Sequence, residues 1–288
     1  MTIGPKLAFI DVDGTLVGSD LSIAPATASA ITQAQRAGFP IILASGRPFE
    51  SMEQLAAGVG IDFPILIGYG GSAVCGLLPH GKVNILGELG YDVRARVAEA
   101  INTGGVGAFA YGPSARLAFG NPDLLDIEAR RSGLPYDVIS QVDALVDQDI
   151  IPELFKVLLI AADGIEAEEL KEEMSPALMG SASVTSTYPE YVEVTPPLVS
   201  KRSAAALVAK SLGLELEESL VIGDGENDIE ILSATPWSVC VANAHPNARS
   251  VAHYLAPSND EDGVAVAIEH FLLGSRSANS MITQLSPS

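Results

Sequence analysis

The sequence Leu7-Ala8-Phe9-Ile10-Asp11-Val12-Asp13-Gly14-Thr15 decides the fold, because an apolar run ends there in two carboxylates and a glycine turn. A second apolar run, Leu220-Val221-Ile222, ends in the same way at Gly223-Asp224-Gly225-Glu226-Asn227-Asp228. Short continuous apolar runs are typical of strands buried on both faces of a parallel sheet. The carboxyl ends of parallel strands share one edge, so we expect the two acidic turns to lie together.

The segments around both turns alternate between strand and helix signals. Within the first eighty residues, we expect strands at 6–10, 39–44 and 64–67. We expect one helix at 25–37 and a second that follows Pro48 and ends at about Ala57. After residue 201 we expect a helix at 203–211, strands at 220–222 and 238–241, and a helix at 227–233. This alternation predicts an α/β fold, a doubly wound, parallel-sheet, Rossmann-like core.

The intervening chain is less regular, which predicts an inserted α+β domain. A hairpin is expected after Gly68, with Pro79-His80-Gly81-Lys82 as its turn. Beyond it we expect helices at 92–102, 122–132 and 166–174 and strands at 115–119 and 155–161. The core therefore takes residues 1–82 and 187–288, with 275–288 as a polar mobile tail, and the inserted domain takes 83–186.

Composition narrows the functional class. The 288 residues carry 16 basic and 36 acidic side chains, a net charge of −20, which disfavours a partner with a nucleic-acid backbone. No apolar run approaches the roughly 20 residues that span a bilayer, and no signal-peptide pattern opens the chain. The two cysteines, Cys75 and Cys240, lie in apolar segments and show no metal-ligand spacing with the histidines. We therefore expect a cytoplasmic protein without a nucleic-acid or membrane partner.

Four carboxylates in the two turns, Asp11, Asp13, Asp224 and Asp228, predict a cation site. Gathering them costs several kcal/mol of repulsion unless a cation neutralises them. Hard oxygen ligands in an open arrangement suit Mg²⁺. Each turn alone would pass as an ordinary Asp-Gly turn, and it is the pair at two strand ends that favours the metal site.

Asp11 and Asp13 stand two residues apart, so along an extended strand end their side chains point the same way. One carboxylate can attack phosphorus to form an aspartyl-phosphate. The other can handle the proton of the leaving group, provided that burial and neighbouring carboxylates raise its pKa.

A phosphate cradle is indicated by Ser45-Gly46-Arg47, which follows the strand at 39–44. A hydroxyl and exposed backbone N–H groups at a strand-to-helix turn bind phosphate, and Arg47 could add bidentate contacts. A helix cap at Ser45 with a surface arginine is the plainer interpretation. Lys201 begins a helix, where the helix dipole disfavours a cation, and a phosphate oxygen nearby would explain it.

Taken in order, Asp-x-Asp-Gly-Thr, Ser-Gly-Arg, Lys and Gly-Asp-Gly-Glu-Asn-Asp resemble the four motifs of the haloacid dehalogenase-like phosphatase superfamily. The segments at 243–248 and 259–264 resemble its Cof-type sugar-phosphatase branch. Because only one helix fits between Asp13 and Ser45, the inserted α+β domain is similar to the family's type IIB cap. Such a cap closes over the site and selects the substrate.

The resemblance implies roles for individual residues. Asp11 would be the nucleophile, and Asp13 the general acid/base whose main-chain carbonyl also ligates Mg²⁺. Ser45, Gly46 and Lys201 would hold the phosphoryl oxygens. Asp224 would ligate the metal and Asp228 would support it directly or through water. Arg47, Asn227 and Asn243 are candidate substrate contacts.

These roles predict a Mg²⁺-dependent phosphomonoester hydrolase that acts on a small phosphorylated metabolite, most plausibly a sugar phosphate. A phosphomannomutase-like phosphohexomutase would use the same aspartyl-phosphate, and a non-catalytic sensor would bind without turnover. Two departures from the family's pattern, Tyr69 where an Asn is usual and Arg202 where a Gly is usual, border the expected pocket and leave the substrate open.

Overall fold

The computed structural model describes residues 4–79, 82–112, 116–139, 141–186, 188–275 and 278–286. The chain divides into two compact units. The core unit comprises Met1–Asn84 and Ser200–Ser288, and the inserted unit comprises Ile85–Val199. None of the helices in the described ranges is long and apolar enough to cross a membrane.

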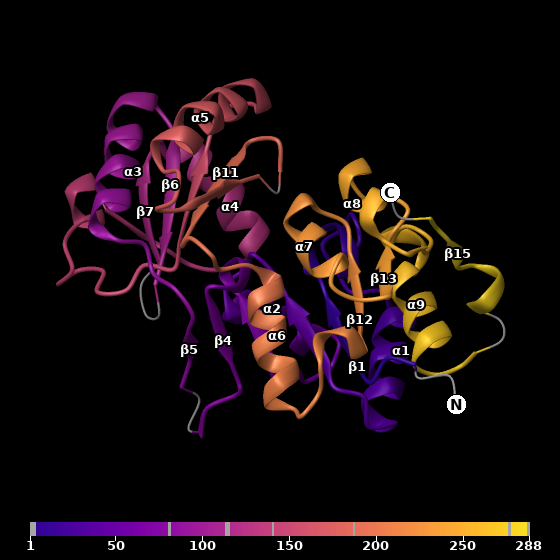
Figure 1. Cartoon of the computed structure of the whole chain (residues 1–288). Helices are drawn as coiled ribbons and strands as arrows, with labels where there is room; N and C mark the ends of the chain where they lie inside the picture. The colour runs from indigo at the N-terminus through magenta and orange to yellow at the C-terminus, as the bar shows by residue number, and fades with distance from the viewer. Residues whose placement is uncertain are drawn as a thin grey trace. The chain divides into compact units, whose positions relative to one another are not determined.

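The core unit is built on a mostly parallel sheet that begins with β1 (Leu7–Ile10), the indigo strand of Figure 1. β1 pairs in parallel with β2 on one side and with β12 on the other. The strands in order across the sheet are β15 (Thr283–Gln284), β14 (Tyr254–Leu255), β13 (Trp237–Cys240), β12 (Ser219–Gly223), β1, β2 (Ile41–Ala44), β3 (Leu66–Gly68), β4 (Ala73–Cys75) and β5 (Asn84–Ile85). The chain order reverses at β1, so the topological switch point of the sheet lies between β1 and β12.

Two pairs of helices pack against one another and against this sheet, α1 with α9 and α6 with α7. The strands between them are buried along their whole length, as the continuous apolar runs predict. The helices are α1 (Pro25–Arg36), α2 (Phe49–Gly58), α6 (Lys201–Ser211), α7 (Ile229–Leu232), α8 (Pro246–Val251) and α9 (Gly263–Phe271). The expected α/β core with its parallel sheet is confirmed.

A second, mostly antiparallel sheet forms the inserted unit. Across it lie β10 (Ser183–Thr185), β11 (Tyr191–Thr195), β9 (Lys156–Ile160), β6 (Gly107–Tyr111), β7 (Arg116–Gly120) and β8 (Asp137–Val138). Its helices are α3 (Tyr91–Gly104), α4 (Pro122–Ser132) and α5 (Gly164–Ala177). Alternate strand residues such as Val157 and Leu159 join side chains of α3 and α5 in one apolar core.

Two expected boundaries need correction. The return to the core was expected at residue 187, but β11 pairs antiparallel with β9, so the chain stays in the inserted unit until Val199. The segment 275–288 was expected to be a mobile tail, but Thr283–Gln284 pairs antiparallel with β14. Two-residue strands have no detectable periodicity, which is why the sequence pattern did not indicate this one.

The hairpin expected after Gly68 corresponds to β4 and β5, which are neighbours in the core sheet. Of its expected turn, His80 and Gly81 lie outside the described residues. β4 also pairs antiparallel with β3, through Leu66 and Cys75 among others. The core sheet therefore ends on this side in strands that depart from the parallel pattern.

Candidate active site

The two acidic turns lie side by side because their strands are neighbours. Ile10 of β1 is in register with Ile222 of β12, and the N–H of Asp11 donates to the Ile222 carbonyl at 2.9 Å. Asp11 and Asp224 therefore leave the same edge of the sheet from adjacent strands. The expected meeting of the turns is a direct consequence of this parallel pairing.

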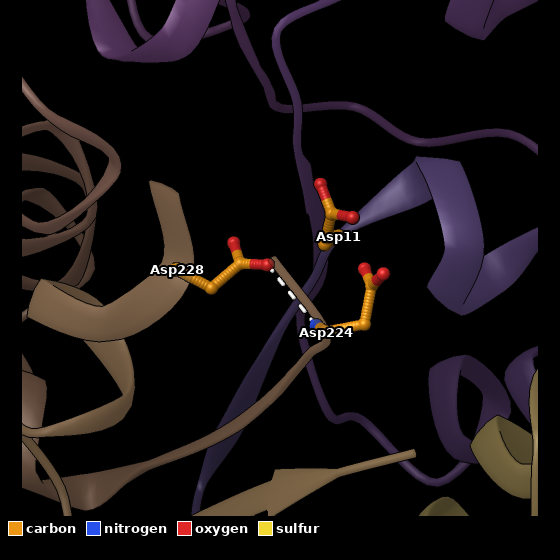
Figure 2. A group of neighbouring side chains, drawn as sticks. All are labelled: Asp11, Asp224 and Asp228. Carbon is orange, nitrogen blue, oxygen red and sulfur yellow. Dashed lines mark hydrogen bonds between the residues drawn. The ribbon is translucent and has the colours of Figure 1, made fainter. Parts of the chain in front are cut away.

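Carboxylate oxygens of Asp11, Asp224 and Asp228, one from each residue, lie within 4.8 Å of one another (Figure 2). Asp228 reaches back to the start of its own turn, where Oδ2 accepts from the N–H groups of Asp224 at 3.1 Å and Gly225 at 3.0 Å. Asp11 and Asp228 are 7% and 1% exposed. The cluster is thus held by backbone contacts and largely withdrawn from solvent.

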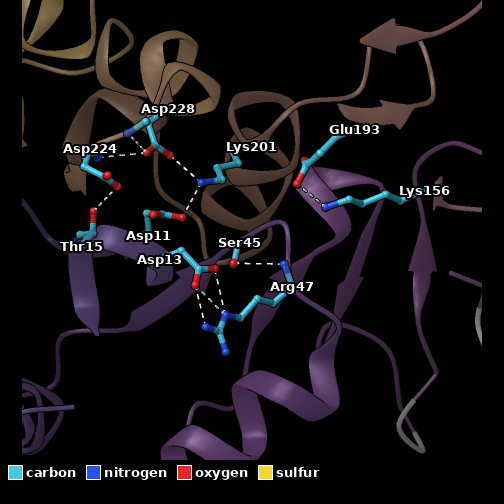
Figure 3. Close-up of polar contacts among 11 residues, drawn as sticks. Asp11, Asp13, Thr15, Ser45, Arg47, Lys156, Glu193, Lys201, Asp224 and Asp228 are labelled. Carbon is cyan, nitrogen blue, oxygen red and sulfur yellow. Dashed lines mark hydrogen bonds and ion pairs between the residues drawn. The ribbon is translucent and has the colours of Figure 1, made fainter. Parts of the chain in front are cut away.

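Lys201 is buried among these acids, at 2% exposure. Its Nζ donates to Oδ1 of Asp11 at 2.5 Å and to Oδ1 of Asp228 at 2.6 Å (Figure 3). The position is enforced by the start of α6, where the Ser200 hydroxyl accepts from the N–H of Ser203 and the Ser203 hydroxyl donates to the Ser200 carbonyl. The two carboxylates offset the unfavourable helix dipole at this first turn.

Burial sets the protonation of the cluster. It raises the pKa of Asp11 well above the ordinary range, and the nearby carboxylates Asp228, Asp224 and Asp13 add to the rise against the opposing effect of Lys201. Burial, with Asp228, likewise raises the pKa of Asp224 to about 6. For Lys201, burial opposes the charged form, but Asp11 and Asp228 outweigh it and raise its pKa. Burial and mutual repulsion therefore disfavour the ionised carboxylates, and a bound cation would stabilise their charged forms.

The turn after Asp11 packs closely against Asp224. Gly14 has a φ of +73°, and a Cβ there would lie 2.4 Å from Oδ2 of Asp224, so only glycine fits. The hydroxyl of Thr15 donates to Oδ1 of Asp224 at 2.8 Å. Thr15 belongs to the first acidic motif, but the sequence does not predict its contact with Asp224. That contact forms because β1 and β12 are paired.

The turn after β2 carries Ser45, Gly46 and Arg47, the residues expected to form a phosphate cradle. Ser45 is 1% exposed and its hydroxyl accepts from the N–H of Arg47 at 3.1 Å. The Arg47 side chain pairs with Asp13: Nη2 lies 2.6 Å from Oδ1 and Nε lies 2.9 Å from Oδ2. Figure 3 shows this fork below Asp13. Arg47, a candidate substrate contact, thus engages the second aspartate of the first motif.

A neighbouring turn, at Tyr69–Gly71, contacts both the turn after β2 and the start of α6. Tyr69 donates its N–H to the Arg47 carbonyl at 3.1 Å, and Gly70 donates to the Ser45 carbonyl at 3.0 Å. Tyr69 has a φ of +54°, which is uncommon for a non-glycine residue, and its ring packs edge-on against Phe49 at 5.3 Å. A Cβ on Gly71 would lie 2.3 Å from the Ser200 carbonyl oxygen, next to Lys201. This turn therefore lies between the Ser45–Arg47 turn and the start of α6.

The side chain of Asn243 forms hydrogen bonds with backbone groups of two other segments. Its Nδ2 donates to the Gly14 carbonyl at 2.7 Å, and its Oδ1 accepts from the N–H of Asn259 at 3.0 Å. Nδ2 of Asn259 in turn donates to the Val17 carbonyl at 2.9 Å. Asn243 therefore supports the first acidic turn, and its expected contact with substrate stays a prediction.

The other two candidates near the pocket differ in exposure. Asn227 is half-buried in the acidic turn, where a Cβ on Gly225 would lie 2.6 Å from its Oδ1. Arg202 is exposed on α6. Within the described ranges, no side-chain hydrogen bond or ion pair assigns a role to either residue, so both stay candidates.

The inserted unit carries its own buried polar groups, on the sheet face opposite its apolar core. Lys156 and Glu193 form an ion pair at 2.7 Å and are 4% and 7% exposed. Glu128 accepts hydrogen bonds from the hydroxyls of Tyr111 and Tyr191, each at 2.9 Å. These buried polar side chains therefore pair with one another within the inserted unit.

The donor set of the core unit fits a hard divalent cation. Asp11, Asp224 and Asp228 supply only carboxylate oxygens, and burial together with the neighbouring carboxylates raises the pKa values of Asp11 and Asp224. Mg²⁺ and Ca²⁺ take such ligands, and Mg²⁺ in particular binds through a few carboxylates with the remaining positions left to water or substrate. Zn²⁺ is disfavoured because the cluster contains no sulfur or nitrogen ligand.

Comparison with characterised proteins agrees with this geometry. The chain is 26% identical over 267 residues to a phosphoglycolate phosphatase from Methanothermobacter thermautotrophicus, covering 91% of this chain and 97% of that protein. It is 28% identical over 276 residues to the chloroplastic endoribonuclease YBEY of Arabidopsis thaliana, covering 93% of this chain. The chain spans about half, 47%, of that plant protein's length.

Solved structures share the fold. A haloacid dehalogenase-like hydrolase from Bacteroides thetaiotaomicron superposes with a TM-score of 0.80 at 25% identity, covering 92% of this chain and 99% of that one. The subclass IIB sugar phosphatase BT4131 superposes with a TM-score of 0.80 at 22% identity, covering 92% and 98%. The family model for haloacid dehalogenase-like hydrolases matches residues 8–268. The chain therefore belongs to the haloacid dehalogenase-like hydrolase family, which confirms the expectation of a hydrolase of the phosphatase type.

Proposed function

We propose that this protein is a Mg²⁺-dependent phosphomonoester hydrolase that works through a phosphorylated Asp11. The observation that carries the proposal is the position of Asp11: it lies at the end of a central strand, with the Lys201 ammonium 2.5 Å away and two further carboxylates beside it. Phosphoryl transfer needs a positioned nucleophile and neutralised phosphate charge, and these groups are suited to both tasks.

In the first half-reaction, a carboxylate oxygen of Asp11 attacks phosphorus while the bond to the leaving alcohol breaks, and Asp13 donates a proton to that alcohol. In the second, water attacks the phosphorus of the aspartyl-phosphate, Asp13 takes the water proton and phosphate leaves. Lys201, already in contact with Asp11, and the Ser45 hydroxyl would bind the phosphoryl oxygens together with backbone N–H groups at Gly46.

Asp11, Asp224, Asp228 and the main-chain carbonyl of Asp13 would hold Mg²⁺. When bound, the ion supplies positive charge that stabilises the transferring phosphoryl group. Thr15 and the backbone N–H groups of the second acidic turn keep Asp224 and Asp228 oriented for this task.

A sugar phosphate or a similar small phosphorylated metabolite is the proposed substrate. Relatives named for phosphoglycolate and for sugar phosphates support this class, as does the resemblance of the inserted unit to a type IIB cap. We propose that this unit selects the substrate through its buried polar side chains. The unpaired cysteines Cys75 and Cys240 support a reducing, cytoplasmic setting.

Phosphate release from a panel of sugar phosphates, nucleotides and 4-nitrophenyl phosphate tests the proposal. We expect turnover with Mg²⁺, none with a chelator, and a loss of at least about 1,000-fold in Asp11→Asn, because that variant lacks the nucleophile. Asp62→Asn is the matched control, since Asp62 is an exposed carboxylate that precedes β3 at the opposite edge of the sheet.

The outcomes separate the alternatives. Turnover that survives in Asp11→Asn overturns the nucleophile assignment. No phosphate release by the wild-type protein, combined with isomerisation of a hexose phosphate, favours the phosphohexomutase alternative. Saturable binding without either reaction favours a sensor.

A further inference from the structure

We infer that Arg47 is a positioning residue that holds the carboxyl group of Asp13, and not a ligand of the substrate. The inference rests on the proposed function, in which Asp13 exchanges the proton of the leaving group. It concerns a residue whose place in a phosphate-binding turn would otherwise suggest a phosphate contact.

The geometry of the pair is bidentate. Nη2 of Arg47 lies 2.6 Å from Oδ1 of Asp13, and Nε lies 2.9 Å from Oδ2 and 3.1 Å from Oδ1. A guanidinium binds a carboxylate or a phosphate through this same edge, so the edge cannot serve both at once. The arginine side chain is 8% exposed and the aspartate side chain 20% exposed, so little water competes for the contact.

The surrounding turn fixes the orientation of the guanidinium. Nη1 of Arg47 donates to the Ser51 hydroxyl at 3.1 Å, one turn into α2. The N–H of Arg47 donates to the Ser45 hydroxyl, and its carbonyl accepts from Tyr69. Side chain and backbone are therefore both anchored by groups other than Asp13, which is the arrangement expected of a support that orients a neighbour.

The orientation of the Asp13 carboxyl group matters for a substrate whose leaving group must receive a proton. A sugar alkoxide is a poor leaving group and needs the proton, whereas 4-nitrophenolate departs without one. Misplacing a general acid should therefore slow hydrolysis of a sugar phosphate much more than hydrolysis of 4-nitrophenyl phosphate. Loss of a phosphate ligand would instead affect both substrates and would weaken the binding of inorganic phosphate.

The test compares Arg47→Lys with Asp13→Asn and with the control Arg36→Lys, an exposed arginine at the end of α1. The lysine keeps the charge and removes the fork. On the best sugar phosphate of the panel, we expect kcat to fall about 100-fold in Arg47→Lys, near the low end of what a general acid contributes. On 4-nitrophenyl phosphate we expect a loss below about 10-fold, and the double variant should be no slower than Asp13→Asn alone.

Inorganic phosphate as a competitive inhibitor supplies the second readout. Its Ki should stay within about threefold of wild type in Arg47→Lys, since the phosphoryl oxygens are bound elsewhere. Ser51→Ala, which removes the hydroxyl that accepts from Nη1, should show the same substrate-dependent pattern more weakly, and thermal unfolding confirms that each variant is folded.

A Ki that rises as much as kcat/KM falls, equally for both substrates, would make Arg47 a phosphate ligand and overturn the inference. Equal losses on both substrates with an unchanged Ki would also overturn it. If the wild-type protein hydrolyses no ester, the proposed function fails separately. Calorimetry with inorganic phosphate then still decides the part played by Arg47, because unchanged binding in Arg47→Lys supports a positioning role and lost binding contradicts it.

Discussion

The Lys201 ammonium lies 2.5 Å from Oδ1 of Asp11, although the two residues are 190 positions apart in the sequence. The same ammonium contacts Asp228 at 2.6 Å, so one buried cation joins the ends of β1, β12 and α6. The contact makes this part of the core unit a buried cluster of charged groups. It also couples the stability of the core unit to the groups that the proposed reaction needs.

Replacing Lys201 by Met should destabilise the metal-free protein by about 3 kcal/mol, because removing one partner of a buried ion pair leaves uncompensated charge. Saturating Mg²⁺ should return part of this loss, since the ion supplies positive charge to Asp11 and Asp228. Urea unfolding with Mg²⁺ and with a chelator measures both effects. Lys210→Met, an exposed lysine at the end of α6, is the control, and an equal loss in the two variants would contradict the prediction.

Asp224 should make the metal-free protein less stable as the pH rises. Its pKa is about 6 in the folded protein, above the ordinary value near 3.9 in an unfolded chain, so the folded state binds the extra proton. The stability contributed by that proton is present below about pH 4 and is lost as the pH rises to about 6 and beyond. Asp224→Asn, which can still accept from Thr15, should therefore unfold at a higher temperature than wild type at pH 7.5 in a chelator.

The stability difference between Asp224→Asn and wild type should be about 1–3 kcal/mol at pH 7.5 and should shrink toward pH 4.5. Mg²⁺ should reverse the order, because it stabilises the wild-type site and finds fewer charged ligands in the variant. Asp62→Asn serves as the exposed control. The prediction fails if the variant is less stable than wild type in the chelator at both pH values.

Asn243 should influence metal binding through the backbone. In Asn243→Ala the Gly14 carbonyl loses its donor, so the turn that carries Asp13 and packs on Asp224 is held less firmly. We expect the Kd for Mn²⁺, used as a probe of the Mg²⁺ site, to rise about fivefold, close to the value of one hydrogen bond. Calorimetric titration measures it. Asn247→Ala is the matched control, because Nδ2 of Asn247 donates to Glu226 and not to the first turn. Equal affinities in the two variants would argue against the support role.

Much of the core unit was predictable because its strands are uniform. The run before Asp11 and the run before Asp224 are continuous and apolar, and parallel pairing leaves few ways to arrange them. Once both runs belong to one parallel sheet, the two acidic turns must share an edge. The close meeting of Asp11, Asp224 and Asp228 follows from that topology without knowledge of any side-chain contact.

Other contacts were not predictable because they depend on tertiary geometry. The sequence placed Arg47 in a phosphate-binding turn, but its pairing with Asp13 depends on how far the turns after β1 and β2 reach toward each other. The hydrogen bond from Asn243 to Gly14 likewise joins segments far apart in the sequence. The segment Tyr191–Thr195 lies within the range 187–288 expected for the core, whereas its antiparallel partner β9 lies in the inserted unit. Local pattern does not specify which sheet an extended segment joins.

Gly71 should be intolerant of a side chain in a way that Gly60 is not. Both have positive φ, +106° and +69°, but a Cβ on Gly71 would lie 2.3 Å from the Ser200 carbonyl oxygen, whereas one on Gly60 meets nothing within 4 Å. Gly60→Ala should cost about 1 kcal/mol from backbone strain alone. Gly71→Ala should cost more, because the start of α6 must move away, and it should also weaken inorganic phosphate binding, because Lys201 moves with that helix end. Urea unfolding and phosphate calorimetry on both variants test this. If Gly71→Ala loses stability but binds phosphate as Gly60→Ala does, the turn supports the fold without positioning Lys201.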